Sequence, residues 1–308
     1  MIITNYTEVP TFTRGGLDIK QYNLIKNESA QFKEGYSSFY KGSNFVANAE
    51  RSLLYHWSEV DGFQLTDDKG TLLWELKARI AYALALPNRQ LLWLVRRDNE
   101  EAITVLLYNY EGTLLAELSM KDELYSSTFL LTALPEEEGI AIDFGGGQDG
   151  SQDYLLVYKD GKITKKKLPA DAYFITTFCK HKKALLLNYY EQQLLLTAYP
   201  SLKIEKTISF PEDEWQISTV QVLGDSLLLL SDTGVGRHYL YDLNREQLQE
   251  EIVLQGYEPT AAEGDDLLES PIMSVYYEEG RFIFHYYDYI DRQVVQRYFV
   301  SEEIAIRG

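Results

Sequence analysis

Residues 62–76 read GFQLTDDKGTLLWEL, two short apolar segments joined by a turn that ends at Gly70. The same pattern returns as VLLYNYEGTLLAEL at 105–118 and as YLLVYKDGKITKKKL at 154–168, with turn glycines Gly112 and Gly161. Hairpin turns often need a positive φ, which glycine adopts without steric cost. The three segments therefore predict three β-hairpins of one kind.

These hairpins belong to a longer repeat, because the turn glycines stand 42 and 49 residues apart. Weaker copies follow at 194–208 and 238–252. A second pair of strand-like apolar runs occurs at 80–95, 129–144, 173–190, 217–231 and 272–287. Each unit thus holds four short strands, and no segment sustains the i, i+3, i+4, i+7 spacing of a helix.

Four short strands in about 45 residues resemble the blade of a β-propeller, as in the WD-repeat and kelch classes. The resemblance rests on the repeat period, since the Trp-Asp dipeptide of WD repeats and the double glycine of kelch repeats are absent from the corresponding positions. It implies an all-β fold in which residues 1–308 form a single propeller domain. The first two strands of each unit are nearly continuous apolar runs, as expected for strands buried on both faces.

Six blades is the predicted number. The predicted boundaries are about 35–77, 78–119, 120–168, 169–209, 210–253 and 254–308. The last unit lacks a fourth strand, which we expect residues 15–25 to supply, so that the N-terminal strand closes the ring and removes two exposed sheet edges. Seven blades is the alternative, because residues 1–9 form a further strand that six blades leave over. Two stacked β-sandwiches are a third possibility.

Composition limits the function classes. Of the residues, 45% are hydrophobic and 25% charged, and 24 are tyrosine, which favours strands. A net charge of −18 disfavours nucleic acids and anionic membrane surfaces. The only cysteine, Cys179, excludes an intramolecular disulfide. The start MIITNYTEVP lacks the features of a signal peptide, and no apolar run approaches about 20 residues. We therefore expect a cytoplasmic protein.

A glycine-rich segment at 143–150 invites a nucleotide-binding interpretation, because Gly145, Gly147 and Gly150 have the G-x-G-x-x-G spacing. That fingerprint requires a following helix, whereas a strand and a hairpin follow here. Ser151 and Gln152 stand where a P-loop needs Lys and Ser/Thr. The segment is therefore predicted to be a loop that binds no nucleotide.

The polar residues of this loop and the Cys-His pair do not predict a cofactor. Asp143, Asp149 and Asp153 are oxygen ligands of the kind that Ca²⁺ takes, but their spacing matches neither an EF-hand nor the Gly-Asp nonapeptide repeats, and we interpret them as solvated carboxylates. Whether they hold a cation is left open. Cys179 and His181 are two of the roughly four ligands that zinc needs, and are interpreted as a buried thiol beside a surface histidine.

One recurrent feature suggests a binding site. An aromatic residue stands at or just before the first strand of five successive units: Tyr36, Tyr82, Tyr125, Tyr173 and Trp215. Acidic residues crowd the same connections: Asp122, Glu123, Asp171, Asp213 and Glu214. In a propeller these connections surround one mouth of the central channel, so the residues would converge. The alternative is that each aromatic side chain packs between neighbouring blades and the acids are only solvated.

The predicted function is that of a non-enzymatic binding or scaffold protein with an acidic, aromatic-lined mouth. Such a mouth suits a protein partner or a small cationic or sugar-like ligand. The alternative is a carboxylate- or metal-dependent hydrolase or lyase. In that case Asp122 and Glu123, with Asp171 or Asp213, would act as acid and base or hold a divalent cation, at the separations of about 5–10 Å that glycosidases use.

Overall fold

The structure, a computed structural model, describes residues 1–306 apart from a set of segments. Those segments are 10–40, 48–51, 68, 87–88, 100–101, 122–127, 135–137, 146–151, 170, 179–181, 189, 211–216, 225, 233–236, 258–272 and 291–292. Within the described part of the chain, no helix is long and apolar enough to cross a membrane.

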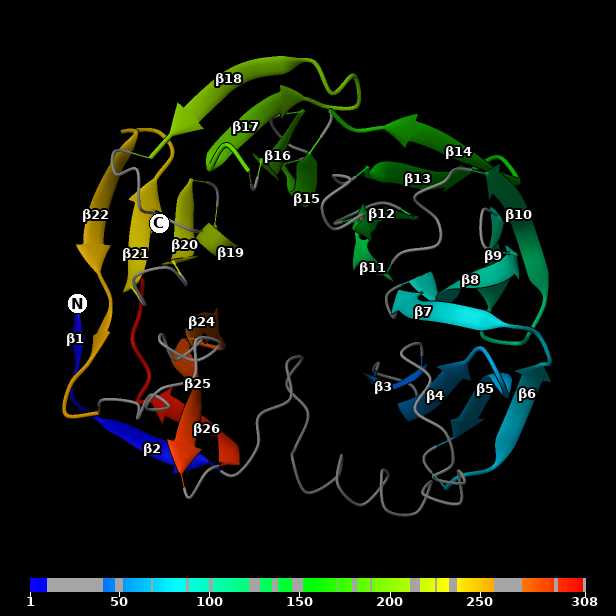
Figure 1. The fold of residues 1–308 in the computed structure, drawn as a ribbon, viewed down its shortest axis with the longest axis horizontal. Coiled ribbons are helices and arrows are strands. Elements are labelled where there is room, and N and C mark those ends of the chain that lie inside the picture. The colour runs from blue at the N-terminus through cyan, green and yellow to red at the C-terminus, as the bar shows by residue number, and fades with distance from the viewer. Residues whose placement is uncertain are drawn as a thin grey trace. The chain divides into compact units, whose positions relative to one another are not determined.

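Four-stranded sheets recur along the chain (Figure 1). The first sheet contains β3 (Lys41–Ala47), β4 (Ser52–Ser58), β5 (Gly62–Asp67) and β6 (Leu72–Leu76). The second contains β7 (Ile80–Leu86), β8 (Leu91–Asn99), β9 (Ala102–Asn109) and β10 (Leu114–Lys121). The third contains β11 (Thr128–Ala133), β12 (Gly139–Gly145), β13 (Tyr154–Lys159) and β14 (Lys162–Lys167). In each, strands adjacent in sequence pair antiparallel.

Three more sheets follow. The fourth contains β15 (Ala172–Phe178), β16 (Lys183–Asn188), β17 (Gln193–Ala198) and β18 (Ile204–Ser209). The fifth contains β19 (Ile217–Leu223), β20 (Leu227–Asp232), β21 (Arg237–Asp242) and β22 (Gln247–Glu251). The last contains β24 (Met273–Glu278), β25 (Arg281–Ile290), β26 (Gln293–Ser301) and β2 (Tyr6–Val9). The described residues thus form six four-stranded sheets, the unit from which β-propellers are built. The predicted all-β fold with a four-stranded repeat is confirmed.

The chain divides into two compact units, Met1–Gly16 with Lys180–Gly308 and Leu17–Cys179. In the second unit the middle strands are apolar on both faces. Leu91, Leu92, Trp93, Leu94 and Val95 of β8 are all buried, as the nearly continuous apolar runs predict. The core of the first unit is built around Phe282, Phe284 and Phe299, with Ile3 from the other end of the chain.

A recurrent hydrogen bond links each of several sheets to the first strand of the next. The first strand is an edge of its own sheet, so its outward N–H groups need other acceptors. Among the described residues, such bonds are Ala85 N to Tyr55 Oη (3.3 Å), Ile217 N to Gln192 Oε1 (2.6 Å) and Val275 N to Ser231 Oγ (3.3 Å). Phe174 N donates likewise to the Asp153 carboxyl group. Different residue types, at different places in their sheets, therefore perform the same task.

The fourth strand of the last sheet differs from the prediction. The position that we expected residues 15–25 to take is occupied by β2, which pairs antiparallel with β26 from Tyr6↔Ser301 to Val9↔Tyr298. Residues 15–25 lie outside the described residues. Ahead of β2, β1 (Ile2–Ile3) pairs parallel with β23 (Val253–Leu254), just beyond the end of β22. The segment 1–9 therefore borders two different sheets of the first unit.

The three turn glycines have the predicted positive φ: Gly70 +79°, Gly112 +80° and Gly161 +76°. They differ in what a side chain would meet. A Cβ at Gly112 would lie 2.9 Å from Trp74 Cγ, whereas a Cβ at Gly161 would meet nothing within 4 Å. Trp74 is held in place by its Nε1 bond to Tyr110 O (3.1 Å).

We therefore expect Gly112→Ala to destabilise the protein more than Gly161→Ala. Both pay about 1–2 kcal/mol for the left-handed backbone, and Gly112→Ala adds about 1–3 kcal/mol because the Trp74 ring must move. Urea unfolding of the two variants followed by tryptophan fluorescence measures the difference. Equal urea midpoints for the two variants would show that the Trp74 ring moves aside without loss of stability.

Candidate binding site

The structure describes three of the ten predicted site residues, namely Tyr82, Asp171 and Tyr173. The other seven lie outside the described residues: Tyr36, Asp122, Glu123, Tyr125, Asp213, Glu214 and Trp215. The convergence of the ten on a common mouth therefore stays a prediction. Cys179, His181 and Asp149 also lie outside the described residues.

Tyr82 lies on the first strand of its sheet and contacts the neighbouring sheet. Its ring is 5.4 Å from that of Trp57 on β4, and Trp57 in turn stacks on Tyr55 at 5.6 Å. The Tyr82 side chain is half-buried, and this burial raises the pKa of its hydroxyl group. Tyr82 therefore packs between two sheets. This is the alternative considered above, in which the recurrent aromatic residues pack between neighbouring blades and do not line a binding site.

Asp171 is the last residue of the connection from β14 to β15, and Tyr173 is the second residue of β15. The residues on either side of the two, Leu168 and Phe174, are both bonded to Asp153. Leu168 N donates to Asp153 O (2.9 Å), and Phe174 N donates to the Asp153 carboxyl group. Between these anchors, Asp171 adopts a left-handed backbone with φ +57°. Asp171 and Tyr173 are both half-buried. A short segment anchored on both sides thus presents a carboxylate and an aromatic ring two residues apart.

Gln152 strengthens the same anchor from the adjacent position. Its buried side chain donates through Nε2 to Asp153 O (2.9 Å) and to Leu168 O (3.3 Å). Its backbone N–H donates to Phe144 O (3.2 Å). Gln152, which stands where a P-loop needs Ser or Thr, therefore has a structural role. It holds the β14–β15 connection against β12.

Asp143 and Asp153 are not the solvated carboxylates that the sequence predicted. Asp153 is 1% exposed and Asp143 is half-buried at the end of β12. The two side chains share a hydrogen bond, and Asp153 also accepts bonds from Phe144 N and Phe174 N. Each carboxyl group still has one buried oxygen, Oδ1, for which the described residues offer no hydrogen-bond partner. The correction follows from packing, because Asp153 is buried and bonded to Leu168 and to Phe174.

This geometry raises the pKa of both groups. Burial, and then the nearby charge of Asp143, raises the pKa of Asp153 to about 9. Burial likewise raises the pKa of Asp143. Two close carboxylates cannot both ionise cheaply, so at neutral pH the pair keeps a proton on Asp153. Among the described residues, no group of three or more Asp, Glu, His or Cys side chains could hold a metal ion.

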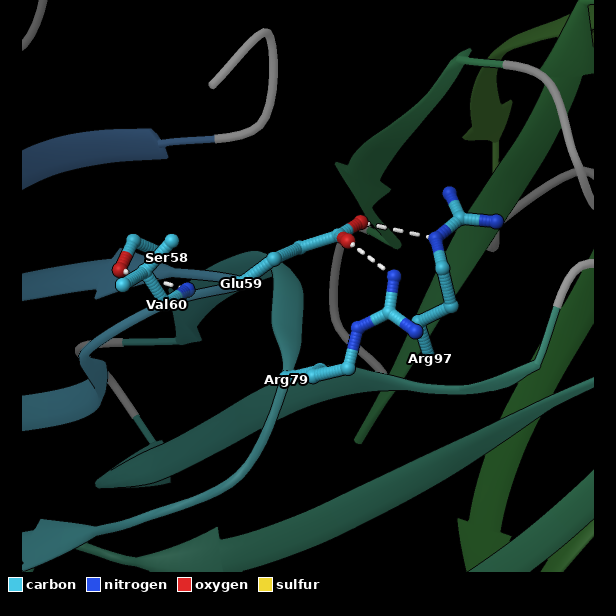
Figure 2. A network of polar contacts seen from close by, with 5 residues as sticks. All are labelled: Ser58, Glu59, Val60, Arg79 and Arg97. Carbon is cyan, nitrogen blue, oxygen red and sulfur yellow. Dashed lines mark hydrogen bonds and ion pairs between the residues drawn. The ribbon is translucent and has the colours of Figure 1, made fainter. Parts of the chain in front are cut away.

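The connection from β6 to β7 is anchored in an equivalent way, but by ion pairs (Figure 2). Glu59, in the turn after β4, binds Arg79 Nη2 through Oε2 (2.9 Å) and Arg97 Nε through Oε1 (2.8 Å). Arg97 N also donates to Arg79 O (2.8 Å). Glu59, which follows β4, thus fixes the β6–β7 connection, and Asp153, which precedes β13, fixes the β14–β15 connection. Each of these connections leads to the first strand of the next sheet.

A Ser-His pair that the sequence did not single out lies in the core of the first unit. Ser231 Oγ is 3.0 Å from His238 Nδ1, and the two residues are 0% and 2% exposed. Burial lowers the pKa of His238 to about 3, so the imidazole is neutral at physiological pH. Because Ser231 Oγ also accepts the Val275 N–H bond, the pair ties strands together and presents no accessible nucleophile.

No protein-family model and no curated protein matches the chain. Solved structures similar to it include the dihydro-heme d1 dehydrogenase NirN in complex with DHE, at 14% identity and a TM-score of 0.48, over 68% of this chain and 47% of that one. The WD40 domain of SCAP from fission yeast is similar at 10% identity and 0.46, over 85% and 66%. Apo AztD from Citrobacter koseri is similar at 10% and 0.46, over 70% and 60%. The chain spans less than two thirds of each.

Proposed function

We propose that this chain is a six-bladed β-propeller, closed by its N-terminal strand, that acts as a non-enzymatic binding protein. Its partner, a protein or a small cationic or sugar-like ligand, binds the acidic and aromatic residues of the connections that lead to the first strands. The number of sheets and the pairing of β2 with β26 support the architecture. Fold alone does not define a function, so the binding proposal rests on the connections themselves.

The observation that carries the proposal is the β14–β15 connection. Bonds to Asp153 hold it at its start and just beyond its end, and Gln152 holds Leu168 as well. A preorganised loop loses little conformational freedom when a partner binds, which favours affinity. A half-buried carboxylate at Asp171, at the end of this loop, and an aromatic ring at Tyr173, on β15, provide the chemistry to attract a cation. The predicted neighbours Asp122, Glu123, Asp213 and Glu214 would add to the same negative field.

The test is the binding of a fluorescein-labelled octa-arginine peptide by anisotropy at 50 and 300 mM salt. We expect replacement of Asp122, Glu123, Asp171, Asp213 and Glu214 by Asn or Gln to weaken binding about 10-fold or more at low salt and to flatten the salt dependence, because exposed charges are screened over about 8–10 Å. The control replaces five exposed carboxylates elsewhere: Glu111, Glu117, Asp160, Glu191 and Glu279. If both quintuple variants lose affinity equally, net charge rather than a site explains the binding.

One observation favours the hydrolase alternative. Asp143 and Asp153 are a carboxyl pair in which one member keeps its proton at neutral pH, the arrangement that acid–base catalysis uses. The pair differs from Asp122 and Glu123 with Asp171 or Asp213, which the sequence indicated. Asp153 is 1% exposed and Asp143 is only half-buried, so the member of the pair that keeps its proton is the less accessible one. Binding therefore remains the better-supported function.

A further inference from the structure

The fourth strand β14 is strongly basic in a protein of net charge −18. Its sequence is KITKKK, and Lys162, Lys165, Lys166 and Lys167 are all exposed. Lys159, directly opposite Lys162 across the hairpin, is exposed as well. Lys162, Lys165 and Lys167 form no ion pair with any described residue, although Lys165 Nζ lies 5.0 Å from the centre of the Tyr154 ring. The strand therefore carries uncompensated positive charge.

The register shows which backbone groups of β14 face outward. Leu168 N donates to Asp153 O, and the pairing continues as Tyr154↔Lys167 to Lys159↔Lys162. Hydrogen-bonded pairs alternate along an antiparallel ladder. Residues 162, 164 and 166 therefore bond to β13, and the N–H and C=O groups of Ile163, Lys165 and Lys167 point away from the sheet. β14 is the last strand of its sheet in the order β11-β12-β13-β14 (Figure 1).

Protection against aggregation does not account for these lysines. Lysine on an edge strand hinders pairing with other chains. Edge strands with exposed apolar residues aggregate most readily, so lysine would be expected on those strands first. The fourth strand β6 is such a strand, with Leu72 49% and Leu73 42% exposed, and its sequence LLWEL has no lysine. The charge is instead concentrated on β14, whose one apolar residue, Ile163, is buried in the core.

We propose that β14 is a docking edge for an acidic, extended segment of a partner protein, which adds to the sheet as a fifth strand. The segment forms main-chain hydrogen bonds with Ile163, Lys165 and Lys167. Its Glu or Asp side chains face Lys165 and Lys167 on one side of the sheet, and Lys162 and Lys166 on the other, because successive side chains alternate. Strand addition of this kind takes affinity from the backbone and specificity from the side chains. This surface is separate from the acidic connections of the proposed function.

The test compares Lys165→Gln with Lys165→Pro, using a fluorescein-labelled peptide of alternating Glu and Thr, nine residues long. Both variants lose the charge and the contact with Tyr154. Only proline removes the outward N–H, and an edge strand tolerates this because no ladder bond is lost. We expect Lys165→Gln to weaken binding about 3-fold and Lys165→Pro more than 10-fold, with unchanged melting temperatures. Replacement of the exposed Lys69, Lys77 and Lys203 by Gln should leave binding unchanged.

Three results would overturn the proposal. Equal affinities of the Gln and Pro variants would show that charge alone attracts the peptide. Binding of oligothymidine or of phosphatidylserine vesicles that the peptide cannot displace would assign β14 to a nucleic acid or a membrane. Dimers of the peptide-free protein that Lys165→Pro dissociates, measured by sedimentation, would make a second copy of this chain the occupant.

Discussion

Removal of residues 1–9 should lower the melting temperature by roughly 10–20 °C. These residues place Ile3 in the core and complete two ladders, with Val253 N donating to Met1 O (2.9 Å) and Gln255 N to Ile3 O (2.9 Å). A buried aliphatic side chain contributes about 1.5–3 kcal/mol and each backbone bond about 1 kcal/mol. The Ile3 side chain and these two bonds together contribute roughly 3.5–5 kcal/mol, and the bonds between β2 and β26 add roughly 2 kcal/mol. A total of roughly 5.5–7 kcal/mol corresponds to that shift at roughly 2–3 °C per kcal/mol.

Tyr6 adds to the loss, and Glu8 provides the control. The Tyr6 ring meets that of Phe299 edge-on at 5.5 Å, and its hydroxyl donates to Gln255 O (3.1 Å). Glu8 forms ion pairs with Arg297, but both groups are partly exposed, so Glu8→Gln should cost about 1 kcal/mol or less. Differential scanning calorimetry measures both variants. A truncated protein that melts within a few degrees of the full chain would refute the role of this segment.

Asp153→Asn should stabilise the protein at pH 8 by about 2 kcal/mol. Asp153 has a pKa of about 9 in the folded protein against an ordinary value of 3.8. Because the pKa of Asp153 is higher in the folded than in the unfolded protein, the protonated side chain contributes its full stability below pH 3.8. That contribution is lost as the pH rises towards 9. Each unit corresponds to about 1.4 kcal/mol, and sharing of the proton with Asp143 reduces the effective shift. Asparagine is neutral at every pH, so it removes this loss.

Asparagine also preserves the backbone hydrogen bonds of the site. Its carbonyl oxygen can replace the Asp153 oxygen that accepts from Phe144 N and Phe174 N, and its Nδ2 then replaces the other carboxyl oxygen, Oδ1. Urea unfolding at pH 5 and pH 8 should show that the wild-type protein is less stable at pH 8 and that Asp153→Asn lacks most of this difference. Asp160→Asn, at an exposed turn position, should behave like wild type. If Asp153→Asn is the less stable protein at pH 8, or if a chelator destabilises only the wild type, the pair is ionised around a cation.

The local elements of this fold could be predicted from sequence, since their causes are local. Gly70, Gly112 and Gly161 mark turns because a positive φ is cheap for glycine, and the apolar runs mark strands buried on both faces. The partner of a strand is a different matter. Residues 1–9 and residues 15–25 both have a strand pattern, and the choice of β2 over 15–25 depends on residues almost 300 positions away.

The candidate site was predicted less well for a similar reason. Asp143 and Asp153 were interpreted as loop carboxylates because the sequence does not show that Leu168 and Phe174 bond to Asp153. An available signal was the position of Asp143 inside the apolar run IAIDFG, where a charged residue requires an explanation. Tyr82, by contrast, followed the repeat, and its ring contacts Trp57 on the adjacent sheet as the structural alternative predicts.

The position of β2 also affects how the protein is made. Tyr6 is synthesised long before its ladder partner Ser301, and Glu8 pairs with Arg297, which lies 289 residues later. At about 5–20 residues per second, the first strand waits roughly 15–60 s for its partner. During that interval the sheet formed by β24, β25 and β26 does not exist, and the nascent chain carries an unpaired strand that other chains can capture. The first unit therefore completes its fold only after Ser301 has been synthesised, and its yield in the cell should depend on chaperones that bind the segment 1–9.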